Sequence, residues 1–131
     1  EYVRPAFEDL LARLQTDYID LGMIHYVDSE EEWEQIQHSD YLDYVMELKN
    51  KGICTYAAHL KGTGSYDEQD YTKGTAFLIG NEGNGLTDQL ADLADTYIRI
   101  PMYGQLESLN AAVASAVLMY ETQRQRRKNG K

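Results

Sequence analysis

The fold is decided by the segment Thr75–Leu86, which reads TAFLIGNEGNGL. Its first five residues are mostly apolar and predict a strand, and the residues after the glycines predict a short helix over about 87–93. The glycines at 80, 83 and 85 let the backbone approach a ligand without obstruction by a Cβ atom. Their spacing differs from that of a dinucleotide-binding fingerprint, and the Lys-Ser/Thr ending of a P-loop is absent. Alone, this run would favour an ordinary glycine-rich turn.

On both sides of this segment, apolar strands and amphipathic helices alternate. Helices are expected over about 4–16, 41–50 and 108–127, strands over 18–27, 53–58 and 97–100, and a surface loop over 59–73. This alternation predicts an α/β fold, a three-layer, Rossmann-like parallel sheet whose ligand lies beyond the C-terminal strand ends. The last helix is expected to bury a stripe of residues at helical spacing, namely Leu109, Ala112, Val113, Ala116, Val117 and Tyr120.

The composition is that of a globular protein with a single α/β domain over residues 1–131. Hydrophobic residues make up 43% of the chain, and no apolar stretch approaches the roughly 18 residues that a membrane span needs. A lone cysteine, Cys54, excludes an intrachain disulfide and argues against a cysteine-based metal site, so no metal is expected. The net charge is −10, and only the last eight residues are strongly basic, which leaves little surface for nucleic acid. Because no signal peptide precedes the first helix, a reducing cytoplasm is expected.

Two further segments give the glycine run a more specific interpretation. Ile98–Met102 (IRIPM) ends a strand, and Glu107–Ala114 (ESLNAAVA) opens the last helix. In this order and at these separations, the three segments resemble the second and third motifs of the SpoU family of RNA ribose 2′-O-methyltransferases, within the SPOUT superfamily, and the resemblance runs over about 54–128. It implies a C-terminal trefoil knot that holds S-adenosylmethionine and a homodimer through the last helix. RNA would be a partner only if the family's activity is retained.

The same resemblance implies the residues of the site. Those expected to contact the cofactor are Gly80, Ile100, Leu109, Leu78, Asn81, Gly85 and Met102. Glu82 and Asn110 would lie beside the methyl-transfer site, with Ser108 supporting them. Transfer to a ribose 2′-hydroxyl needs a bound donor, an aligned oxygen and a group that eases deprotonation. Two alternatives stay open, because Asn110 can instead cap the last helix and Glu82 can be an ordinary loop acid.

The N-terminal segment does not fit this resemblance. The family has an earlier motif with an Asn and an Arg, where the Arg helps to activate the 2′-hydroxyl, and residues 1–50 do not contain it. Instead Val3–Leu21, followed by Ile24 and His25, resembles an aldo-keto reductase, a (β/α)8 barrel that uses NADPH. His25 matches the barrel-strand His of that family, whose Asp, Tyr and Lys partners are absent. We therefore hypothesise a recombined or engineered chimera, in which 1–50 is an α-β-α segment from a TIM-barrel-like parent and 51–131 is SPOUT-like.

Four functions follow in order of preference. The first is a chain that keeps the S-adenosylmethionine site but has lost much of the catalytic apparatus. The second is a structural chimera without activity, and the third is an active RNA ribose 2′-O-methyltransferase. Reductase activity comes last, because one His without its partners cannot carry out hydride and proton transfer.

Overall fold

The protein is described from a computed structural model that covers residues 3–15, 21–24, 31, 34–35, 38, 41–80, 85–104 and 108–130. In chain order, its elements are α1 (Val3–Leu14), β1 (Leu21–Ile24), α3 (Tyr41–Asn50), β2 (Cys54–Ala58), β3 (Gly64–Ser65), a 3-10 turn (Tyr66–Glu68), β4 (Thr75–Ile79), α4 (Asp88–Ala91), β5 (Thr96–Arg99) and α5 (Ala111–Lys128).

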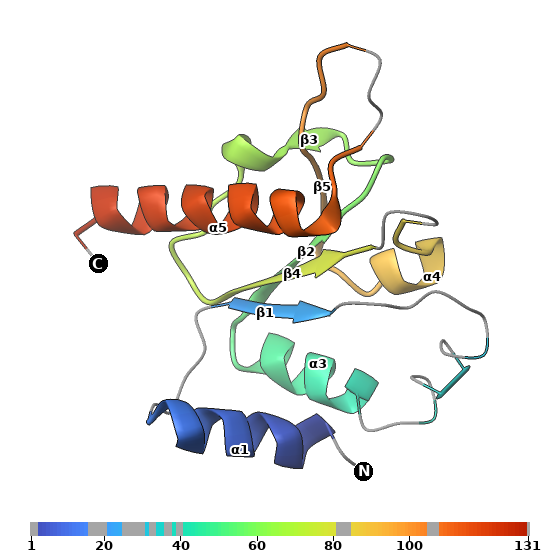
Figure 1. Ribbon diagram of the computed structural model, residues 1–131, viewed down its shortest axis with the longest axis vertical. Coiled ribbons are helices and arrows are strands. Elements are labelled where there is room, and N and C mark those ends of the chain that lie inside the picture. The colour runs from blue at the N-terminus through green and yellow to red at the C-terminus, as the bar shows by residue number, and fades with distance from the viewer. Residues whose placement is uncertain are drawn as a thin grey trace.

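The strands form one sheet in the order β1-β4-β2-β5-β3, and every neighbouring pair is parallel. Figure 1 shows α5 on one side of the sheet and α3 on the other, with α1 beyond α3. This arrangement confirms the expected parallel α/β sheet between layers of helix. A trefoil knot would depend on how the chain passes through 81–84 and 105–107, which lie outside the described residues, so the knot stays a prediction.

Alternation along β4 divides the core between the two faces of the sheet. Phe77 and Ile79 point to the α5 side, where the buried cluster also contains Tyr56, Tyr71, Ile98, Ala111 and Leu118. Leu78 points to the opposite face and packs with Ala57, Leu86, Leu90 and Ala91. Successive residues of a strand face opposite ways, so an unbroken apolar strand is what a sheet covered on both faces requires. The two clusters attach α5 and α4 to opposite faces.

The segment 59–73 was expected to be a surface loop, but it contains the short strand β3, which lies at one edge of the sheet. It turns back at Gly62, whose added Cβ would lie 2.6 Å from the carbonyl carbon of Ile98, so only glycine permits this approach to β5. The next residues then pair with β5, with Gly64 opposite Ile98 and Ser65 opposite Arg99. Because this strand is short and made of Gly and Ser, it carries none of the apolar alternation that predicts a strand.

The expected buried face of the last helix was wrong. The residues that α5 buries are mostly small, namely Ala111, Ala114, Ser115, Leu118, Glu121 and Thr122. The Ser115 and Thr122 hydroxyls donate to the carbonyl oxygens of the residues four positions earlier, at 2.6 and 2.9 Å, so both polar groups are satisfied inside the core. In contrast, Val113 and Tyr120 of the predicted stripe are 49% and 80% exposed. Apart from Leu118, the larger apolar side chains of α5 are therefore not the ones that it buries against its own sheet.

Other boundaries are close to those expected. The bounds of α3 agree with the predicted helix 41–50. β1 (Leu21–Ile24) lies within the predicted strand 18–27, whose other residues lie outside the described ones. α5 begins at Ala111 rather than at Ser108, because Asn110 caps it. Within the part of the chain that the structure describes, no helix is both long enough and apolar enough to cross a membrane.

Candidate functional site

The candidate site lies at the C-terminal edge of the parallel sheet. The register pairs Ala58 of β2 with Ile79 of β4 on one side and with Ile98 of β5 on the other. The next residues, His59, Gly80 and Arg99, therefore stand at the same level where the three strands end. Two strand spacings, roughly 10 Å, separate the ends of β4 and β5. An edge of this kind, in a sheet with helices on both faces, is where open α/β folds bind their ligands.

The glycines close the loop that leaves β4. A Cβ atom added at Gly80 would lie 2.1 Å from both the carbonyl carbon of Gly85 and the nitrogen of Leu86, so the two ends of the loop are in backbone contact. Gly85 has φ of +70°, in the left-handed region that favours glycine, and Leu86 is buried in the α4 cluster. The residues between, including Asn81 and Glu82, lie outside the described residues. Position 80 thus requires glycine because the backbone of 85–86 lies too close for a Cβ atom, and position 85 favours glycine because its φ is positive.

The segment that leaves β5 and the segment that enters α5 lie at the same end of the sheet. Ile100 packs against the core cluster that contains Ile79 and Ala111, which brings the exit of β5 next to the start of α5. Ile100, Met102 and Leu109 are each half-buried, so apolar surface remains available there. The exits of β4 and β5 and the entry of α5 are therefore gathered at one end of the sheet.

Asn110 has a definite structural role. Its Oδ1 accepts hydrogen bonds from the backbone nitrogens of Ala112 at 3.0 Å and Val113 at 3.4 Å, which is the geometry of a helix N-cap. The capping alternative is therefore confirmed, and a further role beside methyl transfer stays a prediction. Ser108 is exposed. Leu78, by contrast, is 2% exposed with its side chain in the α4 core, which leaves only its backbone on the ligand side.

One cluster of polar side chains at this edge was missed from the sequence. His59 faces Asp88 of α4, with Nε2 and Oδ1 3.5 Å apart, and Lys61 donates from Nζ to Asp88 Oδ2 at 2.5 Å. The hydrogen bond from Lys61 holds the pKa of Asp88 below its usual value. Close by, Tyr97 donates its hydroxyl to Asp92, which raises the pKa of Tyr97 to about 12. His59 and Asp88 are 29 positions apart, and only the parallel register indicates that they meet.

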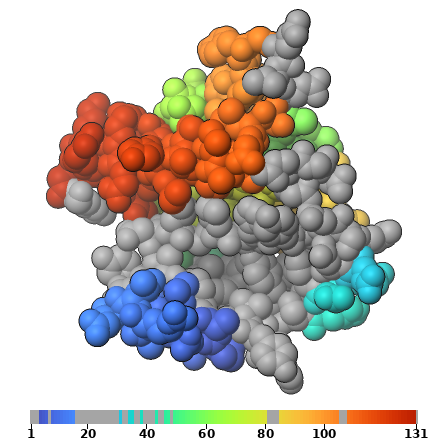
Figure 2. All heavy atoms as spheres, viewed as in Figure 1, coloured from blue at the N-terminus to red at the C-terminus, as the bar shows by residue number. Residues whose placement is uncertain are grey.

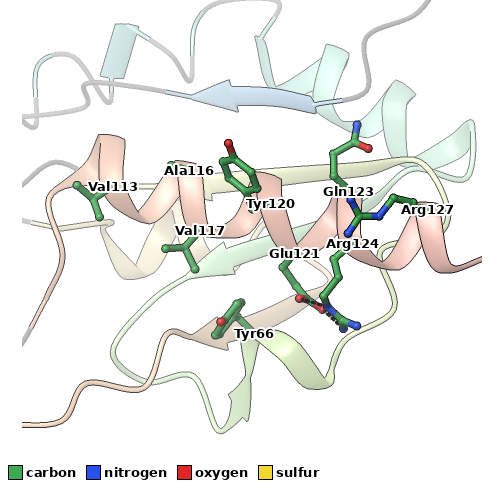
Figure 3. Close-up of a pocket in the computed structure, with 9 residues that line it drawn as sticks. All are labelled: Tyr66, Val113, Ala116, Val117, Tyr120, Glu121, Gln123, Arg124 and Arg127. Carbon is green, nitrogen blue, oxygen red and sulfur yellow. Dashed lines mark hydrogen bonds and ion pairs between the residues drawn. The ribbon is translucent and has the colours of Figure 1, made fainter.

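A second feature is a groove of about 640 Å³ that runs along α5 beside Tyr66. Figure 3 shows its lining, which is Tyr66, Val113, Ala116, Val117, Tyr120, Glu121, Gln123, Arg124 and Arg127. Arg124 donates to both carboxylate oxygens of Glu121 at 2.7 Å, and this bidentate pair lowers the pKa of Glu121. In Figure 2 the atoms of α5, coloured orange to red, run across the surface of the molecule. The groove is built from the same stripe that was expected to face the core.

Across the part of the chain described, no group of three or more His, Cys, Asp or Glu side chains is placed to bind a metal ion. The site instead offers a glycine-closed loop, backbone groups and half-buried apolar side chains at the end of a parallel sheet. These features define an α/β domain of the class in which small organic or nucleotide-like ligands bind at the C-terminal ends of the strands.

Comparison with known proteins then gives the family. The model of the SpoU rRNA Methylase family matches residues 13–120, and the chain belongs to this family. It is 43% identical over 100 residues to the tRNA (guanosine(18)-2′-O)-methyltransferase of Escherichia coli K12, a match over 75% of this chain and 44% of that protein. The corresponding enzyme of Aquifex aeolicus is 42% identical over 87 residues, which are 66% of this chain and 41% of that one. The chain thus spans less than half the length of these relatives.

Solved structures of proteins from the same family resemble this fold. The Aquifex aeolicus TrmH/SpoU tRNA modifying enzyme superposes with a TM-score of 0.65 at 31% identity, over 84% of this chain and 63% of that one. The SpoU methyltransferase AviRb from Streptomyces viridochromogenes, in complex with the cofactor AdoMet, has a TM-score of 0.60 at 36% identity, over 66% of this chain and 34% of that one. The family match begins at residue 13, inside the segment ascribed above to a barrel reductase, so these comparisons lend no support to that origin.

Proposed function

We propose that this chain binds S-adenosylmethionine at the C-terminal edge of its sheet, between the Gly80–Leu86 loop, the exit of β5 and the entry of α5. The observation that carries the proposal is the closure of the glycine loop, in which Gly80 lies against the Gly85–Leu86 backbone at the end of a buried strand. The AdoMet complex of AviRb, a member of the same family, supports it.

The residues present suit such a ligand. Ile100, Met102 and Leu109 are half-buried apolar side chains that can flank the adenine ring, and the glycine loop brings backbone donors and acceptors near it. When bound, the cofactor supplies an electrophilic methyl group on a positively charged sulfur. The residues of this chain bind and orient it and exclude water from it. The fit is to the cofactor, and it requires no metal.

Methyl transfer to RNA is a separate claim. The relatives named above are tRNA 2′-O-methyltransferases, which makes the ribose 2′-hydroxyl of an RNA the expected acceptor. Glu82 and Asn110, with Ser108, are the residues proposed to lie beside that acceptor. The Arg that activates the hydroxyl in the family has no counterpart in residues 1–50. We therefore propose a retained cofactor site whose catalytic apparatus is incomplete.

Some of the basic side chains near the end of α5 already make hydrogen bonds within the protein. Arg126 donates to the carbonyl oxygens of Tyr71 at 3.1 Å and Lys73 at 2.8 Å, and Arg124 is paired with Glu121. A cation held in this way keeps its charge but has fewer donors for phosphate. An RNA surface built on this tail would rely on Arg127 and Lys128, which are both exposed.

A homodimer through α5 belongs to the same proposal. The outward apolar stripe and its groove carry Val113 and Tyr120, and such a patch on a helix face is typical of a protein interface. Tyr120→Glu places a charge in the middle of this face without touching the buried side of α5. In sedimentation experiments the unsubstituted protein is expected to be a dimer and the variant a monomer. A monomeric unsubstituted protein would remove this part of the proposal.

A second candidate, a recombined chain without activity, is favoured by α1. This helix was expected to be amphipathic, and its Leu10 and Leu14 side chains are 41% and 60% exposed. The resemblance of Val3–Leu21 to an aldo-keto reductase is the second support for this candidate.

Two measurements separate the candidates. NMR spectra recorded with S-adenosylmethionine are expected to shift the amide signals of Gly80, Ile100 and Leu109 while leaving those of α3 in place. Incubation of tRNA with labelled donor then tests catalysis. Shifts without labelled RNA support the main proposal, labelled RNA supports an active enzyme, and a folded protein without shifts supports the inactive chimera.

A further inference from the structure

We propose that His59 is a positioning residue for the glycine loop, acting through Asp88 rather than by touching the ligand. Its role in donor binding rests on the proposed function, but its effect on the loop does not. The placement follows from strand alternation. Thr55 and Ala57 of β2 are buried, Ala57 within the α4 cluster, and His59 continues the same alternation one residue beyond the strand, level with Gly80.

The His59 ring is held in one orientation. Its side chain is only 13% exposed, and Nδ1 accepts a hydrogen bond from the backbone nitrogen of Lys61 at 3.2 Å. In the neutral ring the proton therefore resides on Nε2, the atom that faces Asp88. The same loop supplies Lys61 Nζ to the other carboxylate oxygen. One carboxylate of α4 is thus held from two sides by the segment that follows β2.

α4 depends on such contacts for its position. It is four residues long, which is too short to be stable alone. Leu90 and Ala91 bury its inner side. Its first residue, Asp88, faces His59, and its C-cap, Asp92, accepts a hydrogen bond from Tyr97 of β5. The His59 and Tyr97 rings lie edge to face with centroids 5.6 Å apart, so the two contacts form one continuous group.

The position of α4 decides how the glycine loop closes. Thr87 caps the helix and follows Leu86 directly, and the Gly85–Leu86 backbone is what Gly80 lies against. A movement of α4 away from His59 therefore opens the contact between the two ends of the loop. In this way a side chain directly after β2 controls the loop that follows β4.

The test compares His59→Ala with His59→Gln and with Asp95→Asn. The glutamine keeps one donor and one acceptor. Asp95 is a hydrogen-bonded carboxylate near the opposite end of the sheet, where it accepts from the nitrogen and hydroxyl of Thr55, so its variant controls for lost stability alone. In NMR spectra without ligand, His59→Ala is expected to shift the Gly85 and Leu86 amides, whereas the other two variants leave them near their original positions.

Titration with S-adenosylmethionine supplies the second readout. The affinity is expected to fall about tenfold in His59→Ala, the scale of one lost polar contact with a charged group, and to recover in His59→Gln. Asp88→Ala, which also removes the partner of Lys61, should weaken binding at least as much as His59→Ala, and the double variant should be no worse than Asp88→Ala alone. Unshifted Gly85 and Leu86 amides in His59→Ala, or equal shifts in Asp95→Asn, would overturn the inference. Shifted amides in a protein that never binds the donor would support this inference and refute the proposed function.

Discussion

Replacement of Gly80 by alanine is the sharpest perturbation of the glycine loop. The added Cβ would lie 2.1 Å from two backbone atoms, the carbonyl carbon of Gly85 and the nitrogen of Leu86. Because both belong to the main chain, no side-chain rotation relieves the overlap. A normal contact of about 3.5 Å requires the two ends of the loop to separate by roughly 1.4 Å.

This displacement sets the expected magnitude. Added carbons that force backbone shifts typically cost about 1–3 kcal/mol, and a clash with a backbone peptide group, which cannot rotate away, belongs at the upper end. If the binding-competent loop bears the full strain, about 3 kcal/mol corresponds to roughly a hundredfold weaker binding. The free energy of unfolding is expected to fall by at most the same amount, because the loop can open while the sheet stays intact.

Gly74→Ala is the matched control. Gly74 precedes β4 as Gly80 follows it, and a Cβ there would meet the Cγ1 atom of the Ile53 side chain at 3.0 Å. A side chain can yield by a few tenths of an ångström, so stability should change by less than about 1 kcal/mol and donor affinity should not change. Urea unfolding and calorimetric titration with S-adenosylmethionine measure the two quantities. Equal donor affinity in Gly80→Ala and the unsubstituted protein would refute the reasoning.

Three further predictions concern the framework. Leu118→Ala leaves a cavity at a fully buried position between α5 and the sheet. It should lower the free energy of unfolding, measured in urea, by about 2–5 kcal/mol. A loss below about 1 kcal/mol would count against the packing described. Asn110→Ala removes the N-cap of α5 and should lower the free energy of unfolding by about 1 kcal/mol in the same assay. Asn110→Asp, which can still cap the helix, should retain most of the stability. Equal losses in the two variants would argue against capping. Partial burial raises the pKa of Asp95, but hydrogen bonds from Thr55 and Lys49 outweigh it and leave that pKa lowered. A lowered pKa stabilises the fold above the unfolded value of about 3.9, so Asp95→Asn should be less stable than the unsubstituted protein at pH 6, and the gap should close as the pH falls below about 4 in thermal unfolding scans. A gap that stays constant with pH would contradict this.

The parts of the fold that follow a strong local pattern were predictable. The apolar run of β4 ending in glycine gave both a strand and its exit, and α3 was placed with its observed bounds because its pattern stops at Lys51-Gly52. These signals come from neighbours in the sequence, so they need no knowledge of tertiary contacts.

The predictions that were wrong, the buried face of α5 and the loop at 59–73, concern features that depend on tertiary contacts. α5 carries apolar residues on two sides, and periodicity cannot tell which side meets the chain's own sheet and which remains outside, as Val113 and Tyr120 do. The strand β3 has no apolar pattern, and it exists because Gly62 can approach the backbone of β5. Neither contact has a signal in the local sequence.

The candidate site divides in the same way. Gly80 and Gly85 were expected to matter for backbone approach, and the structure gives each a specific reason. The pairing of His59 with Asp88 was missed, because it depends on the register of β2 against β4. Asn110 had two interpretations from the sequence, and its hydrogen bonds establish the capping one.

The central claim is that the ends of β4 and β5 and the start of α5 form a site for S-adenosylmethionine. Isothermal titration of the folded protein with this donor tests it most directly, with Gly80→Ala as the paired sample. The structure predicts saturable binding of one molecule per chain, strongly weakened in the variant. A protein that shows cooperative thermal unfolding yet gives no binding heat and no thermal stabilisation at millimolar donor would contradict it.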